Sequence, residues 1–384
     1  MRMQGIQSEA AFEVFARANA LERQGRSIIH LEIGEPDFDT PPAIVQSGIH
    51  WLKKGATHYS PTQGIPELRE AVAKRLSSRY PVQIDSQNIH VSPGSKVMIF
   101  ACIHAVVDPG DEVIITDPGY PAYEAAARLA GGTPVFVRVD EANQFRLSLD
   151  EVKRGITSRT KLIIINSPQN PTGGVLTLRD LEGLSKLAHK HDLLILSDEI
   201  YENIYYEDRP ASMLDVPDIL DRLLLVNGFS KAWAMTGWRL GFGLIPPEIF
   251  PAVDLFLNTS VSASATFTQW AAIEAFTAES DRDIGKMVQE FRKRRDVFVD
   301  GLNSVPGVRC LKPAGAFYLF PNISGLGKSS KEIADRLLIE TGVAVLPGTG
   351  FGRNGEGFLR LSFANSLSNI ETAIERIRKF VSTL

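Results

Sequence analysis

Lys231 is the side chain in this sequence with the clearest capacity for covalent chemistry. It lies in a glycine- and serine-rich segment between two apolar runs, residues 223–226 and 240–245. We expect the runs to be buried strands and the segment between them to be an irregular loop. A lysine held against apolar surface has a lowered pKa and a nucleophilic amine, which can form a Schiff base with a carbonyl.

Two neighbours of this lysine are suited to binding a phosphate. Ser230 precedes it directly, and Arg239 follows in the same loop. A hydroxyl and a guanidinium are both good ligands for phosphate oxygens. A Schiff-base lysine beside phosphate ligands indicates the cofactor pyridoxal 5′-phosphate (PLP). A single loop lysine is more often an ordinary surface residue, so the interpretation needs support from the rest of the chain.

Polar and aromatic side chains follow three other apolar runs. Tyr120 follows residues 111–116, Asn170 follows residues 162–166, and Asp198 and Tyr201 follow residues 193–197. Ligands bind beyond the carboxyl ends of parallel strands, so we expect these side chains to meet at one site. There Asp198 would keep the ring nitrogen of PLP protonated, and Tyr120 would stack on the ring. A helix cap, a turn and packed aromatics are the ordinary alternatives.

Two further segments carry groups that bind anions. The expected strand at 89–92 runs through a glycine turn at 93–96 into an apolar helix at 97–107, an order of elements that presents free N–H groups to a phosphate. Arg360 lies inside the apolar run 358–363. A buried arginine needs a carboxylate, which either the protein or the α-carboxylate of a substrate can supply.

The composition excludes several classes of protein. The 384 residues are 44% hydrophobic and 22% charged, as in a globular protein, and the net charge of −4 offers no basic surface for nucleic acid. No apolar run approaches the roughly 18 residues of a membrane span, and early acidic residues argue against a secretion signal. We therefore expect a cytoplasmic protein without a metal site, in which Cys102 and Cys310 are small core residues.

The pattern of apolar runs predicts an α/β fold. Runs without polar alternation, separated by helices, are typical of a mostly parallel central sheet that is flanked by helices. From about residue 281 a charged helix and shorter strands predict a smaller α+β domain. We expect an N-terminal segment (1–45) that joins the small domain, a large PLP-binding domain (46–280) and the small C-terminal domain (281–384). The glycine-rich stretch 348–352 is interpreted as a turn.

Taken in order, these motifs resemble the class I and II aminotransferases of PLP fold type I, in particular their aspartate and aromatic branch. The likeness extends from residues 34–38 (Gly-Glu-Pro-Asp-Phe) to residues 360–363 (Arg-Leu-Ser-Phe), and residues 230–239 are its most specific part. It implies a PLP-dependent transaminase that moves the amino group of an L-amino acid to a 2-oxo acid. In this family the acceptor is most often 2-oxoglutarate and the kinetics are ping-pong.

The resemblance also implies a role for each candidate residue. Lys231 would form the Schiff base and Asp198 would hold the pyridine nitrogen. The remaining assignments are Asn170 and Tyr201 at the ring's phenolic oxygen, Tyr120 on the ring, Gly94, Ser95, Ser230 and Arg239 at the phosphate, Lys96 as a further cofactor-binding residue, and Gly34, Asn170 and Arg360 at the substrate α-carboxylate. Tyr59 would reach the cofactor phosphate of a neighbouring subunit, which implies a homodimer with shared sites. Gly228 departs from the family, since many relatives have a phosphate-binding serine there.

Other functions on the same scaffold remain open at this point. A β-lyase acting on cysteine conjugates, or a cyclopropane-forming synthase, would keep the same lysine, aspartate and arginine. A non-catalytic PLP-binding regulatory protein is a further alternative, although no added basic segment precedes the helix expected at residue 10. These motifs do not distinguish aspartate, aromatic and aliphatic amino acids as the donor. Lys96 and His104 are candidates for a second cation, and residues 258–269 are candidates for the pocket wall.

Overall fold

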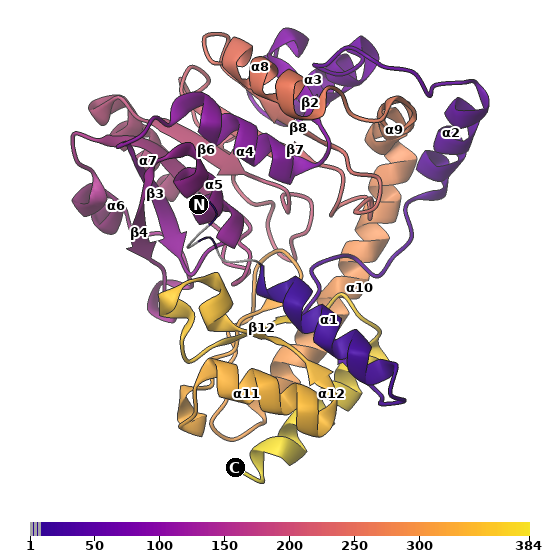
Figure 1. Ribbon diagram of the computed structural model, residues 1–384, viewed down its shortest axis with the longest axis vertical. Helices are drawn as coiled ribbons and strands as arrows, with labels where there is room; N and C mark the ends of the chain where they lie inside the picture. The colour runs from indigo at the N-terminus through magenta and orange to yellow at the C-terminus, as the bar shows by residue number, and fades with distance from the viewer. Residues whose placement is uncertain (1–2, 4–5, 7–8) are drawn as a thin grey trace.

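The computed structural model describes residues 3, 6 and 9–384. Figure 1 shows a larger α/β part and, below it, a smaller part that contains α1, α11 and α12. None of the helices in the described part of the chain combines the length and the apolar composition that crossing a membrane requires. Both cysteines are buried and unpaired.

A seven-stranded sheet forms the centre of the larger part. Its order is β2-β8-β7-β6-β5-β3-β4, and only β8 runs antiparallel to its neighbours. The strands are β2 (Ile89–Ser92), β3 (Glu112–Asp117), β4 (Thr133–Arg138), β5 (Thr160–Asn166), β6 (Leu194–Asp198), β7 (Leu223–Gly228) and β8 (Gly241–Leu244). This confirms the predicted α/β fold with a mostly parallel central sheet.

Helices cover both faces of this sheet. In β5, Leu162 and Ile164 enter the core on one face, while Ile163 and Ile165 enter the core on the other. Because neither face meets water, the strands carry apolar residues at successive positions instead of alternating with polar ones. One face is covered by α4 (Ser95–Val106), α5 (Pro121–Ala130) and α8 (Phe250–Val261), and the other by α3 (Pro66–Arg79), α7 (Leu178–His191) and α9 (Thr266–Ala272).

Two short sheets form the smaller part. β1 (Ile29–His30) pairs in parallel with β10 (Val343–Ala344), and β12 (Leu359–Ser362) lies antiparallel between β9 (Tyr318–Leu319) and β11 (Leu346–Pro347). The helices are α10 (Ala278–Asn303), α11 (Ser330–Arg336) and α12 (Leu367–Val381). Their apolar faces enclose a second core around Phe291, Phe298 and Phe363.

The N-terminal segment passes from the smaller part to the larger one. α1 (Ala10–Glu22) packs on β10 and β11, whereas α2 (Pro42–Lys53) packs against α9. The long helix α10 returns from the neighbourhood of α9 to α12 (Figure 1). On these contacts we propose the division into residues 1–45, 46–280 and 281–384, in which the first limit falls inside α2 and the second inside α10.

β1 consists of two residues only. Only Ile29 and His30 pair with β10, although the Leu31 N–H still donates to the Ala344 carbonyl at 3.0 Å. The Glu32 carbonyl then accepts a hydrogen bond from the Arg360 guanidinium. A side chain thus takes the acceptor that a neighbouring strand would have used, and the chain turns toward Gly34.

Candidate active site

A cavity of about 540 Å³ lies at the carboxyl ends of the parallel strands, which is within the usual size range of small-molecule sites. Both parts of the protein contribute to its wall. Of the residues singled out in the sequence, the wall contains Gly34, Ser95, Lys96, Tyr120, Asn170, Asp198, Tyr201, Ser230, Lys231, Arg239 and Arg360. Residues from remote segments of the sequence therefore meet at one site, as the strand-end argument predicted.

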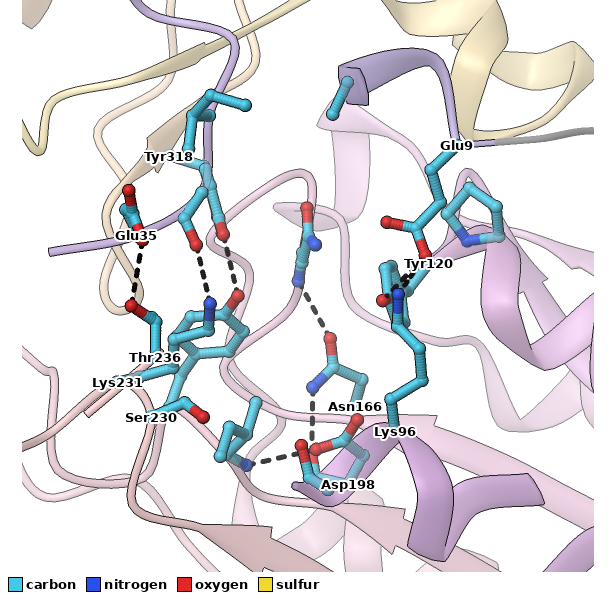
Figure 2. Close-up of a pocket in the computed structure, with 18 of the residues that line it drawn as sticks. Glu9, Glu35, Lys96, Tyr120, Asn166, Asp198, Ser230, Lys231, Thr236 and Tyr318 are labelled. Atoms are coloured by element: carbon cyan, nitrogen blue, oxygen red, sulfur yellow. Dashed lines mark hydrogen bonds and ion pairs between the residues drawn. The ribbon is translucent and has the colours of Figure 1, made fainter. Parts of the chain in front are cut away.

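Lys231 extends into this cavity from the loop between β7 and β8 (Figure 2). Its Nζ donates to the Gly34 carbonyl at 2.6 Å and lies 6.0 Å from the centre of the Phe317 ring. Burial lowers the pKa of Lys231 to about 8, an effect that the charge of Glu35 opposes and that the charge of Arg360 reinforces. The amine is therefore closer to its neutral, nucleophilic form than an exposed lysine would be.

Asp198 ends β6 and is buried. One carboxylate oxygen accepts from the Tyr123 hydroxyl at 2.8 Å, and the other accepts from the Ile200 N–H at 3.1 Å. Burial raises the pKa of Asp198 to about 6, while these two hydrogen bonds and the charge of Lys231 act in the opposite direction. A cation placed against this carboxylate would lower its pKa again, so the site favours a protonated ring nitrogen.

Two asparagines connect the ends of β5 and β6. Asn166 donates from Nδ2 to the Asp198 carbonyl at 2.9 Å, and its Oδ1 accepts from the Asn170 N–H at 2.9 Å. The Asn170 Oδ1 is buried and finds no hydrogen-bond partner among the residues described. Buried amide oxygens are normally paired, so this atom marks a position where a ligand donor fits.

A pair of tyrosine hydroxyls joins the larger part to the smaller one. The hydroxyls of Tyr201 and Tyr318 lie 2.7 Å apart, and both side chains are buried. Gly34 packs directly against this pair, since a Cβ at position 34 would lie 2.3 Å from the Tyr318 hydroxyl oxygen. Glycine at this position thus lets Tyr318 reach Tyr201.

The N-terminus of α4 and the lysine loop form one end of the cavity. Gly94 precedes the helix with φ +92°, and a Cβ there would lie 2.5 Å from Nη2 of Arg239. Ser95 and Ser230 belong to the same wall. Free helix N–H groups, hydroxyls and a guanidinium together suit a phosphate. Gly228 is outside this wall, and a Cβ on it would press on the Gly241 Cα at 3.0 Å.

Arg360 projects from the middle of β12 into the opposite side of the cavity. Its guanidinium carbon lies 4.6 Å from the centre of the Tyr318 ring, and its Nε has no hydrogen-bond partner in the described chain. Burial lowers the pKa of Arg360, while the nearby tyrosines and the carboxylates of Glu32 and Glu9 raise it. A guanidinium in such a position is well placed to take a bidentate carboxylate.

The structure also shows where other candidates lie. His104 is outside the cavity wall and bonds to the Phe100 carbonyl oxygen at 2.8 Å. Residues 258–269 likewise contribute nothing to the wall as described. Tyr59 is 93% exposed and outside its own chain's cavity. The stretch 348–352, interpreted as a turn, forms a short 3-10 helix (Gly348–Phe351), and two of its residues, Gly350 and Phe351, line the cavity.

Sequence reasoning missed four residues of this site. Asn166 ends β5 as Asp198 ends β6, so the strand-end argument applied to it equally. Tyr123 lies one helical turn after Tyr120, and this spacing was a usable signal. Tyr318 and Glu9 carried no local signal, because they reach the cavity only through the docking of the smaller part.

The residues fit PLP. The partnerless Asn170 oxygen, the buried Asp198 carboxylate and the phosphate-suited end around Gly94 and Arg239 offer ligands to different sides of one aromatic ring. Lys231 supplies an amine to the same cavity. Among the described residues, no group of three or more His, Cys, Asp and Glu side chains is arranged to hold a metal ion.

Comparison with known proteins identifies a family. Residues 26–377 match the model for aminotransferase class I and II. The chain is 42% identical to an aspartate aminotransferase of Pyrococcus abyssi, covering 92% of each chain, and 40% identical to aromatic-amino-acid aminotransferase 2 of Thermococcus litoralis, covering 98% and 97%. The solved structure of a Thermus thermophilus aspartate aminotransferase with maleate superposes with a TM-score of 0.94 at 38% identity, covering 98% of each chain.

Proposed function

Since this chain belongs to the class I and II aminotransferases, enzymes that use PLP, we propose that it takes the amino group from aspartate or from an aromatic or aliphatic L-amino acid and passes it to 2-oxoglutarate. The observation that carries the proposal is the placement of Lys231, Asp198 and Arg360 around one cavity. The names of the relatives support the choice of donors. One cavity that serves both substrates in turn supports ping-pong kinetics.

Each of these residues has a definite task in the proposed reaction. When bound, PLP supplies an aldehyde that condenses with amines and a ring that accepts electron density from a substrate carbon. Lys231 Nζ would take the proton from the α-carbon of the donor as a general base, and in the second half-reaction it would deliver a proton to the α-carbon of the product as a general acid. Arg360 holds the α-carboxylate, which fixes the direction in which that proton leaves.

The remaining groups orient the ring. Asp198 would keep a proton on the ring nitrogen, and Tyr123 holds that carboxylate in place through its hydroxyl at 2.8 Å. The Asn170 side-chain NH2 group and the Tyr201 hydroxyl would donate hydrogen bonds to the phenolic oxygen. The Gly94 N–H already donates to the Ser92 carbonyl at 2.7 Å, so the Ser95 N–H, the Ser230 hydroxyl and the Arg239 guanidinium would hold the phosphate. We also retain the homodimer and the cytoplasmic location as proposals.

The test is the substitution Lys231→Ala, with Lys186→Ala as a matched control because Lys186 is an exposed lysine of α7. We expect Lys231→Ala to lower turnover by about 10³-fold or more, since both the covalent amine and the proton carrier are lost. The control should keep the wild-type rate. A panel of L-amino acids is assayed against 2-oxoglutarate, pyruvate and oxaloacetate.

Two results would contradict the proposal. One is wild-type turnover by Lys231→Ala. The other is a protein that transaminates no donor in the panel but releases pyruvate and ammonia from a cysteine thioether in the absence of a 2-oxo acid. These products without an acceptor are those of a β-lyase.

A further inference from the structure

A carboxylate at the start of α1 enters the cavity, and no step assigned above uses it. Glu9 Oε1 lies 2.5 Å from Lys96 Nζ and accepts a hydrogen bond from the Tyr120 hydroxyl at 3.1 Å. The Lys96 ammonium lies 5.6 Å from the centre of the Tyr120 ring. Figure 2 shows the three side chains meeting on the side of the cavity opposite Lys231. Three remote segments of the chain thus converge on one carboxylate.

Glu9 is held in this position by the packing of α1. Val14 and Ala18 of the helix are buried with Leu346 and Phe351, which also line the cavity. A Cβ added at Gly350 would lie 3.1 Å from the Cβ of Ala10, so the first residue of α1 packs closely against Gly350. The backbone at position 9 is therefore fixed against the smaller part, and only the Glu9 side chain needs to rotate to release Lys96.

The other cations of the cavity already have tasks. In the described wall, the basic side chains are those of Lys96, Lys231, Arg239 and Arg360. The proposed function assigns Lys231 to proton transfer, Arg239 to the phosphate and Arg360 to the α-carboxylate. Lys96 is the cation that remains for a second carboxylate on a substrate, and Glu9 neutralises it.

We propose that Glu9 is a specificity-determining residue that competes with the side-chain carboxylate of acidic substrates for Lys96. This inference rests on the proposed function. An acidic donor such as aspartate must displace Glu9, because two carboxylates on one ammonium repel each other. An uncharged side chain leaves the Glu9–Lys96 pair intact and packs on apolar wall residues such as Ile99, Leu346 and Phe351. Glu9 thus lowers the efficiency of the enzyme on acidic substrates and not on aromatic ones.

The experiment compares Glu9→Gln with Glu13→Gln in the holoenzyme. Glu13 is an exposed residue of the same helix, so its substitution makes the same change in net charge away from the cavity. The first half-reaction is followed by the cofactor absorbance, with L-aspartate or L-phenylalanine and without a 2-oxo acid. We expect Glu9→Gln to raise the ratio of kcat/KM for aspartate to that for phenylalanine by about fivefold, as for a partly exposed ion pair, and Glu13→Gln to leave it unchanged.

Binding supplies a second readout that needs no turnover. Calorimetry on the same holoenzymes measures Kd for maleate, a dicarboxylate, and for 3-phenylpropanoate, a monocarboxylate. Glu9→Gln should tighten maleate binding by about fivefold and leave 3-phenylpropanoate within twofold. Lys96→Met, made in the chain that keeps Glu9, should weaken maleate binding selectively, and it tests the inference even if Glu9→Gln does not fold.

The outcomes separate the inference from the function on which it rests. The role of Glu9 would be overturned if Glu9→Gln changed the Kd values for maleate and 3-phenylpropanoate equally. It would also be overturned if neither the aspartate-to-phenylalanine ratio of kcat/KM nor the ratio of the two Kd values changed. A holoenzyme that reacts with no amino donor would overturn the proposed function, and the two Kd values would then decide the role of Glu9 by themselves. Tighter maleate binding in Glu13→Gln would also overturn it, because the effect would then come from net charge alone.

Discussion

At the scale of single residues, the reactivity of Lys231 depends on its surroundings. With a pKa of about 8, roughly one amine in ten is neutral at pH 7, against fewer than about one in a thousand for an ordinary lysine. We predict that the rate at which the apoenzyme captures PLP covalently rises about tenfold per pH unit below pH 8 and levels off above it, because only the neutral amine attacks an aldehyde. Stopped-flow absorbance measures this rate.

Glu35 offers a matched change for this prediction. Its carboxylate accepts from the Thr236 hydroxyl at 2.9 Å, and its charge raises the pKa of Lys231 against the larger effect of burial. Glu35→Gln should therefore move the midpoint of the capture profile to lower pH. A profile that rises without a plateau up to pH 10 would show that Lys231 titrates as an exposed lysine does.

The residues of the site that sequence alone could predict share a property. Asp198 is the last residue of its strand, and Lys231 and Asn170 lie within four residues of the ends of theirs, so the end of a strand determines where they lie. Glu9 and Tyr318 could not be found in this way. Their positions depend on how the smaller part docks over the strand ends, and that docking is set by contacts between segments that are remote in sequence.

At the scale of elements, the start of α4 combines a special backbone conformation with a close neighbour. We predict that Gly94→Ala destabilises the apoenzyme by about 1–3 kcal/mol, because alanine is strained at φ +92°, and weakens PLP binding by about tenfold, because its Cβ displaces Arg239. Urea unfolding and equilibrium dialysis measure the two effects.

Gly110→Ala is the control for this prediction. Gly110 has φ +100°, but a Cβ there would have no atom within 4 Å. The control should show the loss of stability caused by backbone strain without the loss of PLP affinity. If both variants weaken PLP binding equally, Arg239 does not hold the phosphate in the way that we propose.

The elements of the larger part were predictable because helices enclose its sheet. A short apolar run such as residues 162–166 forms a buried central strand when helices cover both faces of the sheet. The smaller part was less predictable. Its strands are two to four residues long, and the Glu32 carbonyl just after β1 accepts a hydrogen bond from Arg360 instead of from a neighbouring strand. The bounds of these strands therefore depend on side-chain contacts that no periodicity reveals.

At the scale of the whole molecule, Tyr59 connects the single chain to the proposed dimer. Its side chain is 93% exposed and outside its own cavity, whereas the resemblance gives it a contact with the phosphate of a neighbouring subunit. If Tyr59 contacts a cofactor phosphate as the resemblance implies, that phosphate belongs to another copy of the chain. We predict that Tyr59→Ala weakens PLP binding by about tenfold, the loss of one hydrogen bond to a charged group.

Mixing Tyr59→Ala with Lys231→Ala at a low PLP concentration tests whether that contact crosses the interface. Tyr59→Ala and Lys231→Ala chains, unfolded and refolded together, should form heterodimers in which one site combines an intact Lys231 with an intact Tyr59 from the other chain. At PLP concentrations that leave Tyr59→Ala largely unloaded, random pairing then restores roughly one quarter of the wild-type activity. If Tyr59 served its own chain, every heterodimer would hold one site without the lysine and one without the tyrosine, and mixing would restore nothing. The restored fraction therefore distinguishes a shared site from two independent ones.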